Sequence, residues 1–219
     1  MSSLPELPAN FAAALKLIDE AHAQDPRTVP DGQSGGDGAA AVPYELHYAR
    51  QMTRWLAVRC PEASPTLQLA CRAQHFRRWE TPRSTFPPTR VGYLTWRSRQ
   101  KSQAASQLTT LLSSSSSPSS PTIPTADIDR IAALVRKEGL ATDPETQVLE
   151  DVACLVFLDG ELEGFERDAG DRLGEDKMLG ILRKTWGKIS EEGRKLALEM
   201  RMGERARALV EKALAEEGG

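Results

Sequence analysis

The chain has 219 residues, of which 40% are hydrophobic and 27% charged, with a formal net charge of −3. This profile is typical of a compact soluble protein with one core, and we expect a single domain over residues 1–219. No stretch approaches ~18 consecutive apolar residues, which excludes a transmembrane helix. The first residues lack a basic region followed by an apolar run, so the sequence predicts a cytoplasmic location.

The three cysteines, Cys60, Cys71 and Cys154, are widely spaced and odd in number. They match neither a disulfide framework nor the C-x-x-C spacing of a thiolate zinc site.

Positive charge is concentrated between residues 71 and 101, which we call the basic strip. It holds eight basic residues and one acid, Glu80. Clustered cations add their potentials and attract phosphate or another anion. Alternatively, some arginines are solvated and others pair with residues 143–219, where acids outnumber bases by 19 to 12.

Apolar residues recur at helical spacing along most of the chain, which predicts an all-α bundle of about seven to eight helices. Asn10, Ser64, Thr125 and Ser190 are expected N-caps, and Gly139 is expected to close the fifth helix. The expected helices are residues 10–24, 44–59, 64–80, 95–112, 125–138, 143–159, 171–186 and 190–217.

The segments between these helices are expected to be irregular. Residues 27–42 form a Gly-rich loop that lacks the Lys-Ser/Thr of a phosphate-binding loop, and the chain is extended around Tyr93. Residues 113–122 form a disordered Ser/Pro insertion, and residues 215–219 fray. The apolar run 152–158 is expected to be a buried helix, with a central strand as the alternative.

Polar residues interrupt the apolar pattern of three expected helices. His75 lies among apolar residues of the third helix, Glu45 and His47 begin the second, and Glu150 with Asp151 precede the apolar run. Two histidines and several carboxylates from separate helices match the N and O ligands of a divalent metal. Each of these polar residues also has a structural explanation, as a hydrogen-bonded core residue or an ion-pair partner.

Two further groups have both a functional and a structural interpretation. His22 continues the apolar face of the first helix, where it can join the polar cluster or pack at the helix C-terminus. The aromatic side chains near the arginines can stack on a base or pack in the core; they are Trp79, Tyr93, Trp96 and Trp186.

Several strings in the chain, in this order, resemble the domain of unknown function 4202 family of bacteria and fungi. They are LKLIDEAHAQDP, PYELHYARQMTRWL, LACRAQHFRRWETPRSTFP, RVGYLTWR, LEDVACLVFLD and RKTWGKIS. The resemblance covers nearly the whole chain and implies an uncharacterised helical protein. Some members carry the label glutamyl-tRNA synthetase. The chain lacks the H-x-G-H and K-M-S-K-S signatures and the length for a Rossmann catalytic domain, so we do not expect aminoacylation.

A more distant likeness is to the HD-type metal-dependent phosphohydrolases, which are all-helical. His47, His75 and Asp151 follow the order of the metal ligands in that family, but Phe76 replaces the Asp of the His-Asp doublet. Glu45, Glu80 or Glu150 would have to substitute for it.

The first functional hypothesis is a metal-dependent phosphohydrolase. His47, His75, Asp151 and Glu45 would hold manganese, iron or zinc, which lowers the pKa of a bound water. Glu80 and Glu150 would be the catalytic carboxylates. The residues expected to bind a small phosphorylated substrate are Arg72, Arg78, Arg83, Arg97, Tyr93 and Trp96.

The alternative is a non-catalytic module that binds RNA or a nucleotide through the basic strip, with structural histidines. A scaffold that has neither site stays open, because the acidic C-terminal helices offer an interaction surface. Neither a membrane nor DNA is an expected partner.

Overall fold

The computed structural model describes residues 3–30, 41–114 and 122–215, with the side chains of residues 161 and 163–173 left out. The all-α prediction is confirmed, because the described ranges contain nine α-helices and one small sheet. The chain forms two compact units, residues 1–149 and 150–219. The expected single domain stays a prediction.

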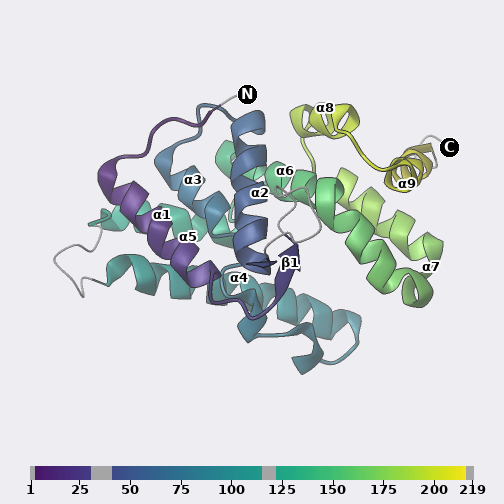
Figure 1. The fold of residues 1–219 in the computed structure, drawn as a ribbon, viewed down its shortest axis with the longest axis horizontal. Coiled ribbons are helices and arrows are strands. Elements are labelled where there is room, and N and C mark those ends of the chain that lie inside the picture. Colours follow the sequence, from purple (N-terminus) through teal and green to yellow (C-terminus); the bar gives the residue numbers. More distant parts are fainter. Residues whose placement is uncertain (1–2, 31–40, 115–121, 216–219) are drawn as a thin grey trace. The chain divides into compact units, whose positions relative to one another are not determined.

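The first unit is built on five complete helices in its described part. They are α1 (Ala9–His22), α2 (Tyr44–Arg59), α3 (Pro65–Arg72), α4 (Arg90–Ser113) and α5 (Thr125–Arg136). Helix α3 packs between α2 and α5, α1 lies against α2 and α3, and α5 packs on α4 (Figure 1). The largest buried side chains of the unit are Ile18, Met52, Leu56, Leu67, Leu69, Phe76, Leu108, Ile131, Leu134 and Leu149.

A short antiparallel hairpin joins α1 to α2. Its strands are β1 (Thr28–Pro30) and β2 (Ala41–Pro43), with Val29 opposite Val42. The prediction of a loop over residues 27–42 is therefore wrong at both ends. The glycines at 31–40 lie outside the described residues.

The expected third helix ends earlier than its apolar pattern predicts. Ser64 caps α3 as expected, by accepting a hydrogen bond from the Leu67 N–H at 3.1 Å. The helix nevertheless stops at Arg72, because His75 (φ 62°) and Arg77 (φ 49°) adopt left-handed backbone conformations. A turn over residues 73–77 and the 3₁₀ helix Arg78–Glu80 follow. The prediction that His75 lies on a helix is wrong.

Helix α4 starts earlier than expected. The side chain of Thr89 accepts a hydrogen bond from the Gly92 N–H at 3.1 Å, which caps the helix at Arg90. The prediction of an extended chain around Tyr93 is therefore wrong. At the end of α5, Lys137 (φ 58°) takes the left-handed position that we expected of Gly139, which also has a positive φ.

Helix α6 (Pro144–Val156) crosses the boundary between the units, and residues 152–158 are helical as predicted. A π-helical turn, Phe157–Glu161, leads directly into α7 (Leu162–Trp186). The gap expected between residues 159 and 171 is therefore wrong. Gly174 interrupts α7 with a positive φ of 63°, a conformation that is cheap for glycine.

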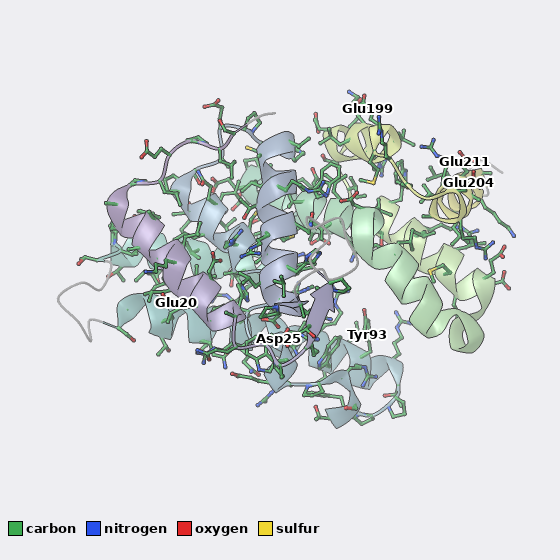
Figure 2. All side chains as sticks on the ribbon, in the orientation of Figure 1. Glu20, Asp25, Tyr93, Glu199, Glu204 and Glu211 are labelled. Carbon is green, nitrogen blue, oxygen red and sulfur yellow. The ribbon has the colours of Figure 1, made fainter. Side chains whose placement is uncertain are left out.

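The second unit ends in two helices where the sequence predicts one. Ser190 caps α8 (Glu191–Glu199) as expected, and a break at residues 200–203 precedes α9 (Glu204–Ala215). Helix α9 packs on α7. Acidic side chains expected in this region lie on both helices, including Glu199, Glu204 and Glu211 (Figure 2).

The expected Ser/Pro insertion is shorter at its start than predicted, because Ser113 is the last residue of α4. Residues 115–121 of the insertion and residues 216–219 of the expected frayed tail lie outside the described residues. In the part of the chain that the structure describes, no helix has the length and apolar character needed to cross a bilayer.

Gly92 allows the first turn of α4 to approach the chain before it. A Cβ added to Gly92 would lie 2.3 Å from the Pro87 carbonyl oxygen. We expect Gly92→Ala to lower the free energy of unfolding by about 1–3 kcal/mol, because backbone must move. Gly180→Ala is the control, since an added Cβ meets nothing within 4 Å there. Urea unfolding measures both, and equal stability of Gly92→Ala and the wild type would contradict this close approach.

Candidate anion-binding site

The first unit contains a cavity of about 80 Å³ between the turn after α3, helix α4 and the end of α5. Four cationic side chains line it: Arg78, Arg97, Lys101 and Lys137. No aspartate or glutamate lines it among the residues that the structure describes. The uncharged lining residues are Gln74, His75, Trp96, Gln100, Ala104 and Val135.

Helix α4 supplies one wall because its lining residues share a face. Trp96, Gln100 and Ala104 are four residues apart, and Arg97 and Lys101 form the adjacent row. The Gln100 amide donates hydrogen bonds to the Thr81 carbonyl at 2.6 Å and to the Arg78 carbonyl at 3.2 Å. This wall is therefore tied to the turn that supplies Arg78.

Trp96 and Arg78 hold each other in place at the cavity. The Trp96 indole N–H donates to the Thr81 carbonyl at 3.0 Å, and the Arg78 guanidinium lies 4.7 Å from the centre of the ring system. Such cation–π contacts orient a guanidinium without neutralising it. Burial lowers the pKa of Arg78, but an arginine remains charged in proteins.

His75 is neutral in this arrangement. Its Nε2 lies 2.7 Å from an Arg78 guanidinium nitrogen, which can only donate, so Nε2 accepts and the proton resides on Nδ1. Burial, followed by the charges of Arg78 and Lys137, holds the pKa of His75 well below its ordinary value. The ring stacks on Tyr48 at 4.3 Å, and Nδ1 is buried without a hydrogen-bond partner in the described chain.

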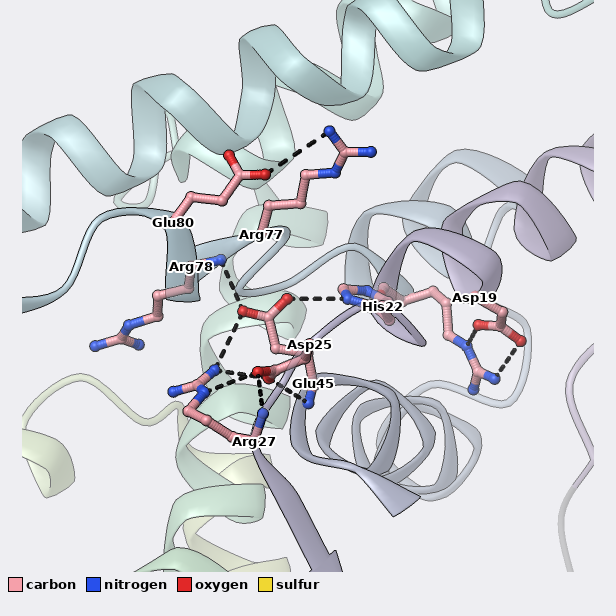
Figure 3. A network of polar contacts seen from close by, with 9 residues as sticks. Asp19, His22, Asp25, Arg27, Glu45, Arg77, Arg78 and Glu80 are labelled. Atoms are coloured by element: carbon pink, nitrogen blue, oxygen red, sulfur yellow. Dashed lines mark hydrogen bonds and ion pairs between the residues drawn. The ribbon is translucent and has the colours of Figure 1, made fainter. Parts of the chain in front are cut away.

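The buried carboxylate of Glu45 fixes the turn that carries His75 and Arg78 (Figure 3). One oxygen accepts a hydrogen bond from the Arg78 backbone N–H at 2.7 Å, and the other lies 3.2 Å from His22 Nδ1. The Arg27 guanidinium is 3.5 Å from the first oxygen. Glu45 itself is fully buried at the start of α2.

His22 and Glu45 share one proton. His22 Nε2 donates to the Arg72 carbonyl at 2.9 Å, so the contact between Nδ1 and Glu45 needs a further proton on one of the two groups. Burial raises the pKa of Glu45, while the hydrogen bond with His22 acts in the opposite direction. The contact between His22 and Glu45 therefore links α1 to α2.

Two of the arginines expected to bind phosphate are engaged elsewhere in the first unit. The Arg72 guanidinium is buried and donates to both carboxylate oxygens of Asp19, at 2.6 and 2.8 Å (Figure 3). Arg83 donates to the carbonyls of Phe86 and Pro87, both at 2.8 Å. Both arginines lie outside the residues that line the cavity.

Among the described residues, no group of three His, Cys, Asp or Glu could hold a metal ion. Within the second unit, the fully buried Asp151 accepts hydrogen bonds from the Ser190 N–H at 2.8 Å and hydroxyl at 2.5 Å. Glu150 lies 3.7 Å from the Lys188 ammonium group. His47 lies partly buried on α2. The metal site stays a prediction.

Of the remaining expected site residues, Glu80 lies away from the cavity and Tyr93 lies beside it. Glu80 is exposed and accepts from the Gln107 amide at 2.6 Å, away from the cavity lining. Tyr93, labelled in Figure 2, is exposed beside the cavity, with its hydroxyl 3.4 Å from the Arg97 guanidinium. Three residues expected to bind substrate, Arg78, Trp96 and Arg97, and one expected metal ligand, His75, line the cavity. Their roles stay predictions.

Sequence reasoning did not select Lys101, Lys137, Gln74 or Gln100 as site residues. Lys101 belongs to the basic strip and lies one turn after Arg97, which is a signal that helical spacing could have used. Lys137 lies outside the strip, and only the packing of α5 on α4 brings it to the cavity.

A family model described as a domain of unknown function (DUF4202) matches residues 12–210. The chain belongs to this family. No curated protein and no solved structure matches it. The family match covers both units and confirms the resemblance found in the sequence, whereas the likeness to HD-type phosphohydrolases stays a prediction.

The role of Glu45 can be tested by two substitutions. Glu45→Ala leaves His22 Nδ1 and the Arg78 N–H without their hydrogen-bond partner, and we expect a loss of about 3–5 kcal/mol in the free energy of unfolding. Glu45→Gln keeps an acceptor for Arg78 and a donor for neutral His22, so it should cost at least about 1 kcal/mol less. Chemical denaturation at pH 7 measures both, and equal losses would contradict this account of the carboxylate.

The neutral state of His75 gives the protein a pH dependence. Below about pH 6.5 the unfolded chain protonates this imidazole and the folded chain does not. The free energy of unfolding therefore decreases as the pH is lowered, by up to ~1.4 kcal/mol per pH unit. His75→Asn removes this term and tolerates the positive φ. The stability of His75→Asn relative to the wild type should therefore increase as the pH is lowered from 7.5 to 5.5. A constant difference in the free energy of unfolding would refute the neutral histidine.

Proposed function

We propose that the chain binds the phosphate group of a small phosphorylated ligand in the cavity between the turn after α3, α4 and α5. The observation that carries the proposal is the convergence of Arg78, Arg97, Lys101 and Lys137 around one cavity without a carboxylate among the described lining residues. Four cations sharing one small volume add their potentials at its centre. The site would act in the cytoplasm, where the sequence predicts the protein.

The types of donor also suit phosphate. The planar guanidinium of Arg78 can form two parallel hydrogen bonds to phosphate oxygens, and lysine ammonium groups act as point charges. The amide nitrogens of Gln74 and Gln100 already donate to backbone carbonyls, so the cationic side chains are the donors that suit a phosphate here. The cation–π contact with Trp96 and the hydrogen bond to His75 orient Arg78 before an anion arrives, which lowers the entropic cost of binding.

Binding without hydrolysis agrees best with this lining. Hydrolysis without a metal would need a general base within hydrogen-bond reach of the water that attacks the phosphorus atom. The carboxylates of Glu80 and Glu45 are hydrogen-bonded elsewhere, and His75 already accepts from Arg78. The expected phosphohydrolase and its manganese, iron or zinc remain a second hypothesis, whose test is turnover of a phosphoester by metal-loaded protein.

Titration calorimetry with inorganic phosphate tests the proposed site. Arg97→Gln and Lys101→Gln each remove one charge from the lining, and we expect each to weaken binding at least ~10-fold, equivalent to ~1.4 kcal/mol. Arg99→Gln is the matched control, because it removes the same charge from an exposed position of α4 outside the lining. We expect it to change the affinity less than about twofold, since water and salt screen exposed charges.

Two results would overturn the proposal. One is a wild-type protein that fails to bind phosphate at low ionic strength. The other is an Arg99→Gln variant that loses as much affinity as Lys101→Gln, which would mean that only the net charge of the strip attracts phosphate.

A further inference from the structure

We infer that the cavity selects a terminal phosphate monoester and discriminates against an internal phosphodiester such as the backbone of RNA. This inference rests on the proposed function and specifies its ligand class. It is carried by the size of the cavity, by its charge and by the arrangement of the side chains that enclose it.

The cavity has room for a phosphate group but not for a whole nucleotide. A water-sized group needs roughly 10–15 Å³ of such space, so a cavity of about 80 Å³ holds roughly five to eight of them. A phosphate group has five heavy atoms. A nucleotide, with its sugar and base, must therefore leave most of its atoms outside the cavity.

The charge of the lining favours a dianion. A phosphate monoester carries about −1.5 to −2 charges at pH 7, because its second pKa is near 6. A diester carries one negative charge at any pH near neutrality. Since four cations and no acidic side chain of the described chain line the cavity, the second charge nearly doubles the Coulomb attraction.

The enclosing elements further favour a ligand that enters by its end. The turn after α3, one face of α4 and the end of α5 each provide a wall, and hydrogen bonds from Gln100 tie the first two together. A monoester has a single substituent to accommodate outside the phosphate. A diester has two, and both must leave through the open side of the cavity.

The exposed surface next to the cavity offers a place for that single substituent. Tyr93 lies one turn before Arg97 on α4 and is 41% exposed, with the Arg97 guanidinium 5.8 Å from its ring centre. Exposed aromatic rings stack on nucleobases and other flat groups. Trp96, by contrast, is 7% exposed and already contacts Arg78, so it serves as part of the wall.

The test compares three probes by calorimetry at the same ionic strength: inorganic phosphate, adenosine 5′-monophosphate and the dinucleotide adenylyl-3′,5′-adenosine. The second presents a terminal monoester, and the third presents only a diester. We expect phosphate and the monophosphate to bind and the dinucleotide to bind at least ~10-fold more weakly. Monophosphate binding should also weaken from pH 7 to pH 5 as the ligand loses its second charge.

The outcomes separate this inference from the proposed function. Equal binding of the dinucleotide and the monophosphate, each weakened by Lys101→Gln and not by Arg99→Gln, would overturn the monoester inference and leave a phosphate site that accepts RNA. Failure of all three probes to bind would overturn the proposed function itself. Selective binding of the monoester that Lys101→Gln abolishes and Arg99→Gln retains would support both.

Discussion

The buried carboxylate of Glu45 is the interaction on which the rest of the first unit depends. It contacts His22 at the end of α1 and the backbone N–H of Arg78 after α3. Its own backbone N–H donates to Asp25, which also binds Arg27 at the start of the hairpin. A buried carboxylate is costly unless it is hydrogen-bonded. Three segments distant in sequence, residues 22–27, the start of α2 and the chain after α3, therefore meet at this buried group.

The same carboxylate explains why the chain after α3 leaves the helical path. Two non-glycine residues with positive φ are unfavourable by themselves. The hydrogen bond from Arg78 to Glu45 and the stacking of His75 on Tyr48 offset that cost. As a result, the side chain of Arg78 lies against Trp96 and faces the cavity rather than continuing along a helix. Arg78 thus connects the buried network to the candidate site, through its backbone N–H on one side and its guanidinium on the other.

The sequence predicted much of the helical architecture, because apolar periodicity reports directly on burial. Tyr48, Met52 and Leu56 form the expected buried face of α2. It did not predict that α3 stops at Arg72, since residues 73–80 contain neither glycine nor proline and the turn is stabilised by contacts with α2. Likewise, no local pattern could place Lys137 beside Arg97, because that proximity depends on how α5 packs on α4.

Arg72 and Arg78 show why counting cations in a sequence does not locate an anion site. They are six residues apart in the same strip, yet Arg72 donates to both oxygens of Asp19, which neutralises it inside the unit. The guanidinium of Arg78 has no carboxylate partner among the described residues, and its contacts there are with an aromatic ring and a neutral imidazole. A partly buried cation without a counter-ion destabilises a fold. An added anion would remove that cost. We therefore expect an anion to bind where the fold leaves a cation without a counter-ion, and the total charge of the strip does not locate that place.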